Sequence, residues 1–424
     1  MTTIIVVALL AVFAAVLTRL QGSWSSPAPL FVGFWVLALA LPPLAGYPGT
    51  PDAVLTLGAL VMSWALGSLA GCDLNSRIKN TVSAAPSLRC WRTEYLGHLA
   101  KAGGVTGAAA AYLVVRQTGF HPSSLLSLEG LFQVGNSAAV QRYMGVTEGS
   151  PSVSALLMIT YLGALAAPRW LLFDQTTRRR TLYAAMPIAG AVLYSAVSTA
   201  RTAMIICFVL WIGSYLSCRA YLGREVRLRP ATILGATAVA SAGAALFLGI
   251  AFVRIGGVSG QASHKITKKT EAYAFGYLPA YSAWQTPHGT TSLDFRPRDK
   301  GWGSLTFNGV AKFLGGNPED SEPYSEFIPV DQHGNHTNIF TFFRGALEDF
   351  GRAGAALLLA IGGFVASRAY EKMRRQRRLG SLFTVTALTA AIPLTSSYSI
   401  FYFTNVCGAL ILDAVIFCTL GIRK

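Results

Sequence analysis

The sequence has 424 residues, of which 52% are hydrophobic and only 13% are charged. Soluble proteins carry about 25% charged residues, so this composition excludes an ordinary soluble domain and predicts a polytopic membrane protein. The net charge of +16 does not indicate nucleic acid as a partner. The basic residues concentrate in short connections between apolar runs, as the positive-inside rule expects.

Eleven apolar runs predict eleven membrane-spanning helices in an all-α fold. In chain order these runs are 3–18, 29–46, 53–70, 95–115, 153–168, 182–199, 202–218, 231–252, 352–368, 381–396 and 401–420. The first run lacks a basic start and a cleavage site and is followed by Arg19, so a retained helix is expected rather than a signal peptide. The six cysteines form no Cys-x-x-Cys pattern and predict neither a disulfide framework nor a zinc site.

Short connections rich in Lys and Arg predict the sidedness of the chain. They are residues 77–92, 178–180, 219–229 and 371–378, which all fall on one side of the predicted topology. That side and the C-terminus are therefore predicted to be cytoplasmic. Two longer loops, 116–152 and 254–336, face the opposite side. Because no linker or internal repeat is evident, residues 1–424 are expected to form a single membrane domain with a loop-built cap.

The larger outer loop contains the aromatic stretch YAFGYLPAYSAW, residues 273–284. Its rings and its lack of charge predict a helix lying in the membrane interface. An ordinary solvated loop is the alternative interpretation.

Two arginines lie at the outer ends of predicted spans. Arg201 stands in the small-residue turn STARTA, and Arg254 ends the eighth apolar run. A guanidinium in a partly dry place can offer two parallel donors to a phosphate. Alternatively, either arginine is an interfacial anchor that binds lipid headgroups, and Arg201 can also serve as a helix cap.

The stretch HTNIFTFFRGALEDFG, from His336 to Gly351, places charged and aromatic residues directly before an apolar run. If residues 338–350 are helical, Arg344 and Glu348 are four apart and form an ion pair on one face. Asp349 then points about 100° away and is not explained by that pair. Thr337 or Asn338 is expected to cap this helix.

Four ionisable residues fall within or at the ends of predicted spans. Glu94, His98 and Lys101 share one face of the fourth run, and Asp413 lies deep in the eleventh. They suit a proton path, as in a transporter. Mutual pairing at the start of the fourth span, or a Lys101–Asp413 bridge, is the structural alternative.

Segments from 198 to 351 resemble, in family order, the Wzy-type oligosaccharide repeat-unit polymerases. The matching segments are STARTA (198–203), GYLPAYSAW (276–284), GSLTFNGV (303–310) and NIFTFFRGALEDFG (338–351). The last is similar to the family hallmark that ends in Asp-Phe-Gly. Phe340 where the family usually has Tyr, and Gly345 after the arginine, are the departures.

The resemblance implies a helical fold akin to the O-antigen ligases, of the GT-C type, in the bacterial inner membrane. It implies a metal-independent glycosyltransferase without cofactors that acts at the periplasmic face. Both substrates would be oligosaccharides linked to undecaprenyl diphosphate. The growing glycan would pass from one carrier to the terminal sugar of a repeat unit on the other. A chain-length regulator and a flippase would be partners, within membrane lipid.

The roles expected of single residues follow from that reaction. Without a metal, arginines must stabilise the leaving diphosphate, and the three candidates are Arg201, Arg254 and Arg344. His336 is favoured as the base for the acceptor hydroxyl, with Asp349 and then Glu348 as rivals; a solvated loop histidine is the alternative for His336. Contacts to sugar rings or to the first isoprene units are expected from Asn338, Phe343, Tyr281 and Trp284. Interface anchoring is the alternative for the aromatic residues.

Two other functions fit parts of the pattern. An O-antigen ligase would use the same donor and pass the glycan to lipid A core. A lipid-linked oligosaccharide transporter would place charged residues in many spans, whereas few predicted spans here carry charge in their interiors.

Overall fold

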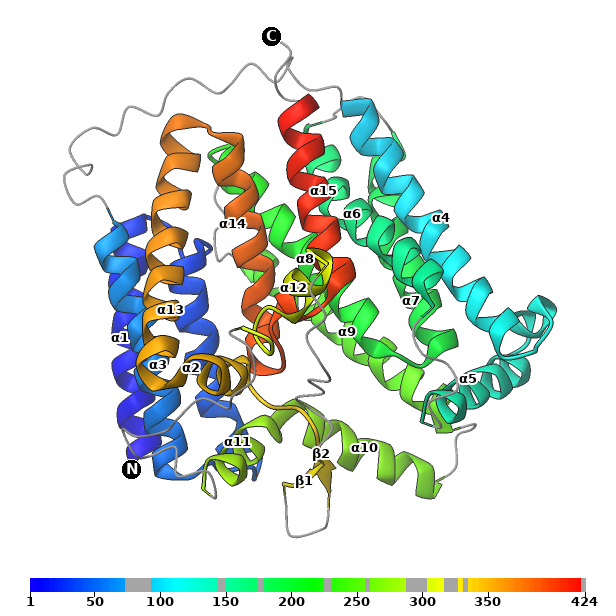
Figure 1. Cartoon of the computed structure of the whole chain (residues 1–424), viewed down its shortest axis with the longest axis horizontal. Coiled ribbons are helices and arrows are strands. Elements are labelled where there is room, and N and C mark those ends of the chain that lie inside the picture. Colours follow the sequence, from blue (N-terminus) through cyan, green and yellow to red (C-terminus); the bar gives the residue numbers. More distant parts are fainter. Residues whose placement is uncertain are drawn as a thin grey trace. The chain divides into compact units, whose positions relative to one another are not determined.

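The computed structural model describes residues 1–72, 93–143, 150–173, 178–224, 230–255, 260–286, 303–315, 327–330 and 335–420. Within these ranges the chain is almost entirely helical (Figure 1). Eight of the described helices are long and apolar enough to cross a membrane. The expectation of an all-α, polytopic membrane protein is thereby confirmed, and the count of eleven spans stays a prediction.

By its contacts the chain divides into two compact units, each assembled from segments distant in sequence. The first unit comprises Met1–Ser87, Arg219–Glu225 and Glu271–Cys407; the second comprises Leu88–Cys218, Val226–Thr270 and Gly408–Lys424.

The first unit is built around three N-terminal helices and the long helix α13. Its elements are α1 (Thr2–Gln21), α2 (Pro27–Leu44), α3 (Pro51–Gly71), α11 (Tyr277–Gln285), α12 (Asn308–Phe313), β1 (Ile328–Pro329), β2 (His336–Thr337), α13 (Phe342–Gln376), α14 (Leu379–Ala391), η4 (Ile392–Ser396) and η5 (Ile400–Tyr402). Strands β1 and β2 form an antiparallel pair in which Ile328 faces Thr337. Helix α3 packs closely on α13 because glycines line the contact. A Cβ atom at Gly67 would lie 1.9 Å from the carbonyl oxygen of Ala360.

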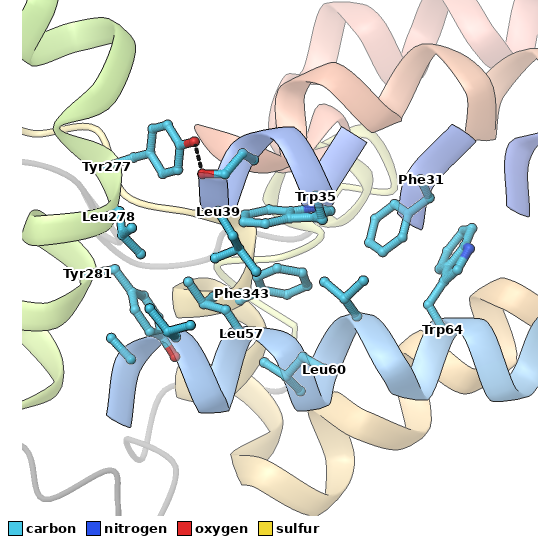
Figure 2. Packing of buried hydrophobic residues seen from close by; sticks show 14 of the residues in the cluster. Phe31, Trp35, Leu39, Leu57, Leu60, Trp64, Tyr277, Leu278, Tyr281 and Phe343 are labelled. Atoms are coloured by element: carbon cyan, nitrogen blue, oxygen red, sulfur yellow. Dashed lines mark hydrogen bonds between the residues drawn. The ribbon is translucent and has the colours of Figure 1, made fainter. Parts of the chain in front are cut away.

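Aromatic side chains from α2, α3, α11 and α13 fill the core of the first unit (Figure 2). The ring centroids of Trp35 and Phe343 are 4.7 Å apart, and Phe31 stacks on Trp64 at 4.4 Å. The hydroxyl of Tyr277 donates a hydrogen bond to the carbonyl of Ala38. The predicted helical segment 273–284 is helical in large part, as expected, because it contains the end of one helix and most of α11. Most of its α11 portion is buried among other helices rather than laid along a membrane surface.

The second unit contains α4 (Thr93–Gln117), η3 (Pro122–Leu126), α5 (Leu128–Tyr143), α6 (Pro151–Phe173), α7 (Arg180–Ser198), most of α8 (Arg201–Tyr221) and α9 (Pro230–Ile255). Helices α10 (Gly260–Phe275) and α15 (Thr404–Leu420) extend across the boundary between the units. Helix α4 matches the fourth predicted span but is not among the eight apolar helices. The eighth and eleventh predicted spans match α9 and α15, whose apolar helical stretches are shorter, Ser241–Val253 and Thr404–Ile416.

Candidate functional site

A break in α13 creates the candidate site of the first unit. Gly351 has φ 64° and ψ −176°, a region that is essentially restricted to glycine. The break separates a short helical segment that begins at Phe342 from the long apolar helix that follows. The charged residues of the sequence motif all lie in the short segment.

The short segment begins later than the sequence indicated. Residues 338–341 lie outside the helix, and the residue preceding it is Thr341, which has extended backbone angles. Neither Thr337 nor Asn338 caps the helix, so that prediction is wrong. The Thr337 hydroxyl instead accepts a hydrogen bond from the N–H of Ile339 at 3.1 Å, which stabilises the chain as it leaves β2.

Arg344 and Glu348 form the ion pair that their spacing predicted. The Nε atom of Arg344 donates to Oε1 of Glu348 at 2.9 Å, and both side chains are nearly inaccessible to solvent. The guanidinium carbon lies 4.1 Å from the ring centroid of Phe340 and 5.4 Å from that of Trp284. Such ring contacts favour a cation in a poorly solvated place, so the charge of Arg344 is held there.

Asp349 connects two of the sequence motifs in space. One carboxylate oxygen accepts the N–H of Thr306 at 2.7 Å, and the other accepts that of Leu305 at 3.1 Å. Ser304 lies at the limit of hydrogen-bond distance from the same group. Charge-assisted bonds to backbone N–H groups fix a loop strongly. The loop 303–307 is therefore held against the start of α13.

His336 and Asn338 lie on the chain that leads into α13. His336 belongs to β2, pairs with Pro329 and is exposed to solvent. Asn338 is half-buried in the extended segment after β2. His336 therefore has the solvent access that a proton acceptor requires.

The aromatic residues expected to contact substrate lie in the core of the first unit. Phe343 and Tyr281 are fully buried and Trp284 is almost fully buried. Burial raises the pKa of the Tyr281 hydroxyl. In this conformation neighbouring helices cover all three side chains. They therefore contribute to the packing of the first unit and are not accessible to a substrate.

Arg201 and Arg254 belong to the second unit. Arg201 opens helix α8 and is half-buried, with its guanidinium carbon 4.2 Å from the ring centroid of Phe247. The preceding turn contains Thr199, whose φ of 55° is unusual for a β-branched residue. Arg254 lies in the last turn of α9, and its side chain is outside the described part of the structure. The convergence of the three arginines stays a prediction.

Asp413 pairs with Arg169, not with Lys101. The two Nη atoms of Arg169 bind the two carboxylate oxygens of Asp413, at 2.5 Å and 2.8 Å, and both side chains are buried. Lys101 lies instead over the ring of Tyr183, with Nζ 4.7 Å from its centroid. The expected Lys101–Asp413 bridge is therefore wrong. A buried carboxylate does require a cation, but the sequence does not tell which one folding brings to it.

Sequence reasoning missed the aromatic rings that contact two of the arginines and the basic partner of Asp413. The rings next to Arg201 and Arg344 are supplied by Phe247 and Phe340, and Arg169 was overlooked at the end of an apolar run. In the described residues, no group of three or more His, Cys, Asp or Glu side chains is arranged to hold a metal ion. Comparisons with known protein families, with curated proteins and with solved structures find no match.

Proposed function

We propose that this protein polymerises lipid-linked oligosaccharide repeat units at the outer face of the bacterial inner membrane. One observation carries the proposal: the carboxylate of Asp349 binds the N–H groups of Leu305 and Thr306. Two of the segments that carry the resemblance, GSLTF and the Asp-Phe-Gly end, are thus in contact although they lie far apart in sequence. The strained residue Thr199 beside Arg201 supports a functional role for the STARTA turn.

In the proposed reaction an acceptor sugar hydroxyl attacks the anomeric carbon of the donor glycan. The bond from that carbon to the diphosphate breaks, and undecaprenyl diphosphate leaves with the electron pair. His336 takes the hydroxyl proton, because it is the exposed candidate among the three proposed bases. Glu348 is bound to Arg344 and Asp349 to backbone N–H groups. Both carboxylates are better suited to positioning.

The diphosphate gains negative charge as it leaves, so cations must be fixed where that charge develops. Arg201 is the strongest candidate, since it is half-buried at a helix start, where backbone N–H groups also favour an anion. Removal of one such donor costs about 3 kcal/mol of barrier, a rate loss of about a hundredfold or more. Arg344 is deeply buried, and its role depends on the motion of the aromatic residues around it.

The experiment that tests the proposal is lipopolysaccharide gel banding in cells that lack this gene. Complementation uses the wild type, Arg201→Ala and the control Arg116→Ala, which removes an exposed arginine at the end of α4. We expect a single-repeat band in the deletion, a ladder with wild type and control, and a single-repeat band with Arg201→Ala at equal membrane level. Free lipid A core together with long glycan on undecaprenyl diphosphate in the deletion would instead identify a ligase.

A further inference from the structure

A cavity of about 230 Å³ lies within the first unit, between α2, α3, α13, α14 and the segments that follow α14. Its wall is made of hydrocarbon and includes five aromatic rings, from Phe31, Trp64, Phe307, Phe342 and Phe401. Figure 2 shows the two neighbouring rings of Phe31 and Trp64 at one end of the aromatic core. A wall of this kind binds an apolar ligand.

The hydroxyl groups of Thr395 and Ser399 in the wall already take part in hydrogen bonds. The hydroxyl of Thr395 accepts from Nε1 of Trp35 at 3.1 Å and donates to the carbonyl of Ile392 at 2.7 Å. The Ser399 hydroxyl accepts the N–H of Phe401 at 3.2 Å. Trp64 contributes ring carbons, since its Nε1 is buried. A polar ligand would lose its hydration without gaining partners, whereas a hydrocarbon chain would lose nothing.

One wall of the cavity is a partly exposed face of α13. Leu358, Ile361, Gly362 and Val365 line it at helical spacing, which covers about 10 Å of the helix. Ile361 is 52% exposed and Val365 is 39% exposed. These exposed apolar residues lie on a helix long and apolar enough to cross a membrane, so this wall of the cavity lies against the hydrocarbon of the bilayer.

Two residues of the cavity wall are close in sequence to residues of the charged site. Phe342, in its wall, is the first residue of α13 and lies two positions before Arg344. Phe307, also in the wall, follows Thr306, whose N–H binds Asp349. A chain bound in the cavity would thus lie near the short charged segment of α13.

We propose that this cavity binds the polyprenyl chain of the lipid-linked substrate, with its diphosphate end toward the start of α13. The inference rests on the proposed function for the choice of a prenyl chain over a phospholipid acyl chain. The aromatic wall supports the same choice, because ring faces suit the methyl branches and double bonds of a prenyl chain.

A cross-linking experiment on the wild-type protein tests the location. The purified full chain in dodecyl maltoside is mixed with a polyprenyl diphosphate that carries a photoreactive diazirine in its chain, then irradiated and digested. We expect labelled peptides to include residues 358–365, and excess undecaprenyl diphosphate to remove the label. Excess dioleoylphosphatidylglycerol that removes the label equally would identify an ordinary lipid cavity, and label confined to other helices would overturn the proposal.

Variants that fill the cavity test its contribution to binding. Val365→Trp and Ala391→Phe add bulk from two different helices, and the affinity for undecaprenyl diphosphate is measured by native mass spectrometry. We expect each to weaken binding about tenfold. The control Leu357→Trp changes an exposed α13 residue that does not line the cavity and should retain the wild-type affinity. Thermal unfolding in the same detergent identifies any misfolded variant, and wild-type affinity in both folded filling variants would overturn the proposal.

The binding experiments do not depend on turnover. Their outcome therefore tests the cavity proposal independently of the proposed polymerase function. Specific prenyl labelling of the cavity in a protein whose deletion leaves free lipid A core and long glycan on undecaprenyl diphosphate would keep the cavity and reject the polymerase. A polymerase confirmed in cells whose filling variants bind and label as wild type would keep the function and reject the cavity.

Discussion

Two buried ion pairs in the described part of this protein are built in opposite ways. In the second unit, Arg169 directs both Nη atoms at Asp413, a residue on another helix and 244 positions away. In the first unit, Arg344 binds Glu348 through Nε within a single turn of α13, and its guanidinium lies over two aromatic rings.

The difference separates two uses of a buried arginine. The Arg169–Asp413 pair links α6 to α15. Each charge neutralises the other in a part of the second unit that solvent does not reach. The Arg344–Glu348 pair joins residues that the helix already holds together, so it contributes little to tertiary structure. Its effect is to hold the guanidinium of Arg344 in a fixed orientation. Such a pair is better suited to a functional role than to the stabilisation of the fold.

The largest effect is expected from breaking the pair between helices. Asp413→Leu leaves the Arg169 charge buried without its carboxylate and should lower the free energy of unfolding by about 3–5 kcal/mol. Thermal unfolding in detergent measures this. The double variant Arg169→Leu with Asp413→Leu should recover most of the loss, because two apolar side chains replace two charges. The exposed acid Asp52, changed to Ala, should cost at most about 1 kcal/mol. A double variant no better than the single one would contradict the pairing.

The next largest effect is expected from substitution of Asp349. This substitution also tests whether Asp349 is the catalytic base or a positioning residue. Asp349→Ala removes the acceptor for the N–H groups of Leu305 and Thr306, and each such bond to a charged group contributes about 1.5–3 kcal/mol. Hydrogen exchange of these two amides should become faster, and polymerisation should be lost.

Asp349→Asn keeps one acceptor oxygen. We therefore expect it to retain slower exchange than Asp349→Ala and a measurable part of the activity. Equal loss of activity in both variants, with the loop still protected in Asp349→Asn, would make Asp349 the base and return His336 to a solvated loop residue.

Substitution of Gly351 tests whether function requires the break in α13 that separates the short charged segment from the long apolar helix. A side chain at its φ of 64° and ψ of −176° costs about 1–3 kcal/mol, so Gly351→Ala should lower stability by that amount and reduce polymerisation. The matched control is Gly380→Ala in α14, where an added Cβ meets nothing within 4 Å. That substitution should be neutral or slightly stabilising. Equal stability of the two variants would show that the break is not needed.

Much of the fold could be predicted from the sequence because hydropathy is a local property. Each predicted apolar run coincides with helical structure, although some helices extend several residues further. The Arg344–Glu348 pair was predicted for the same reason, since helical spacing alone brings the two side chains together. The start of α13 was misplaced because residues 338–341 precede the helix, which begins at Phe342.

The remaining errors concern contacts between distant segments. Asp413 required a basic partner, but Lys101 and Arg169 are both basic and the choice depends on how α4, α6 and α15 pack. The rings of Tyr281 and Trp284 suit a membrane interface and a protein core equally well by composition, and burial decides between them. The link from Asp349 to loop 303–307 was not predicted, because no periodicity relates the two segments.

The smallest effect is expected at a third arginine, Arg201, through the aromatic ring that contacts it. Phe247 supplies a ring 4.2 Å from the guanidinium carbon of Arg201, an interaction that contributes about 0.5–1 kcal/mol at a partly exposed site. Phe247→Leu should therefore lower the rate of polymerisation by about two- to fivefold, while Phe247→Tyr, which keeps the ring, should retain it. The rates are measured with purified protein and lipid-linked repeat units at equal protein amount. If Phe247→Leu loses as much activity as Arg201→Ala, the ring has a direct part in binding substrate, because support of one cation is too weak to explain such a loss.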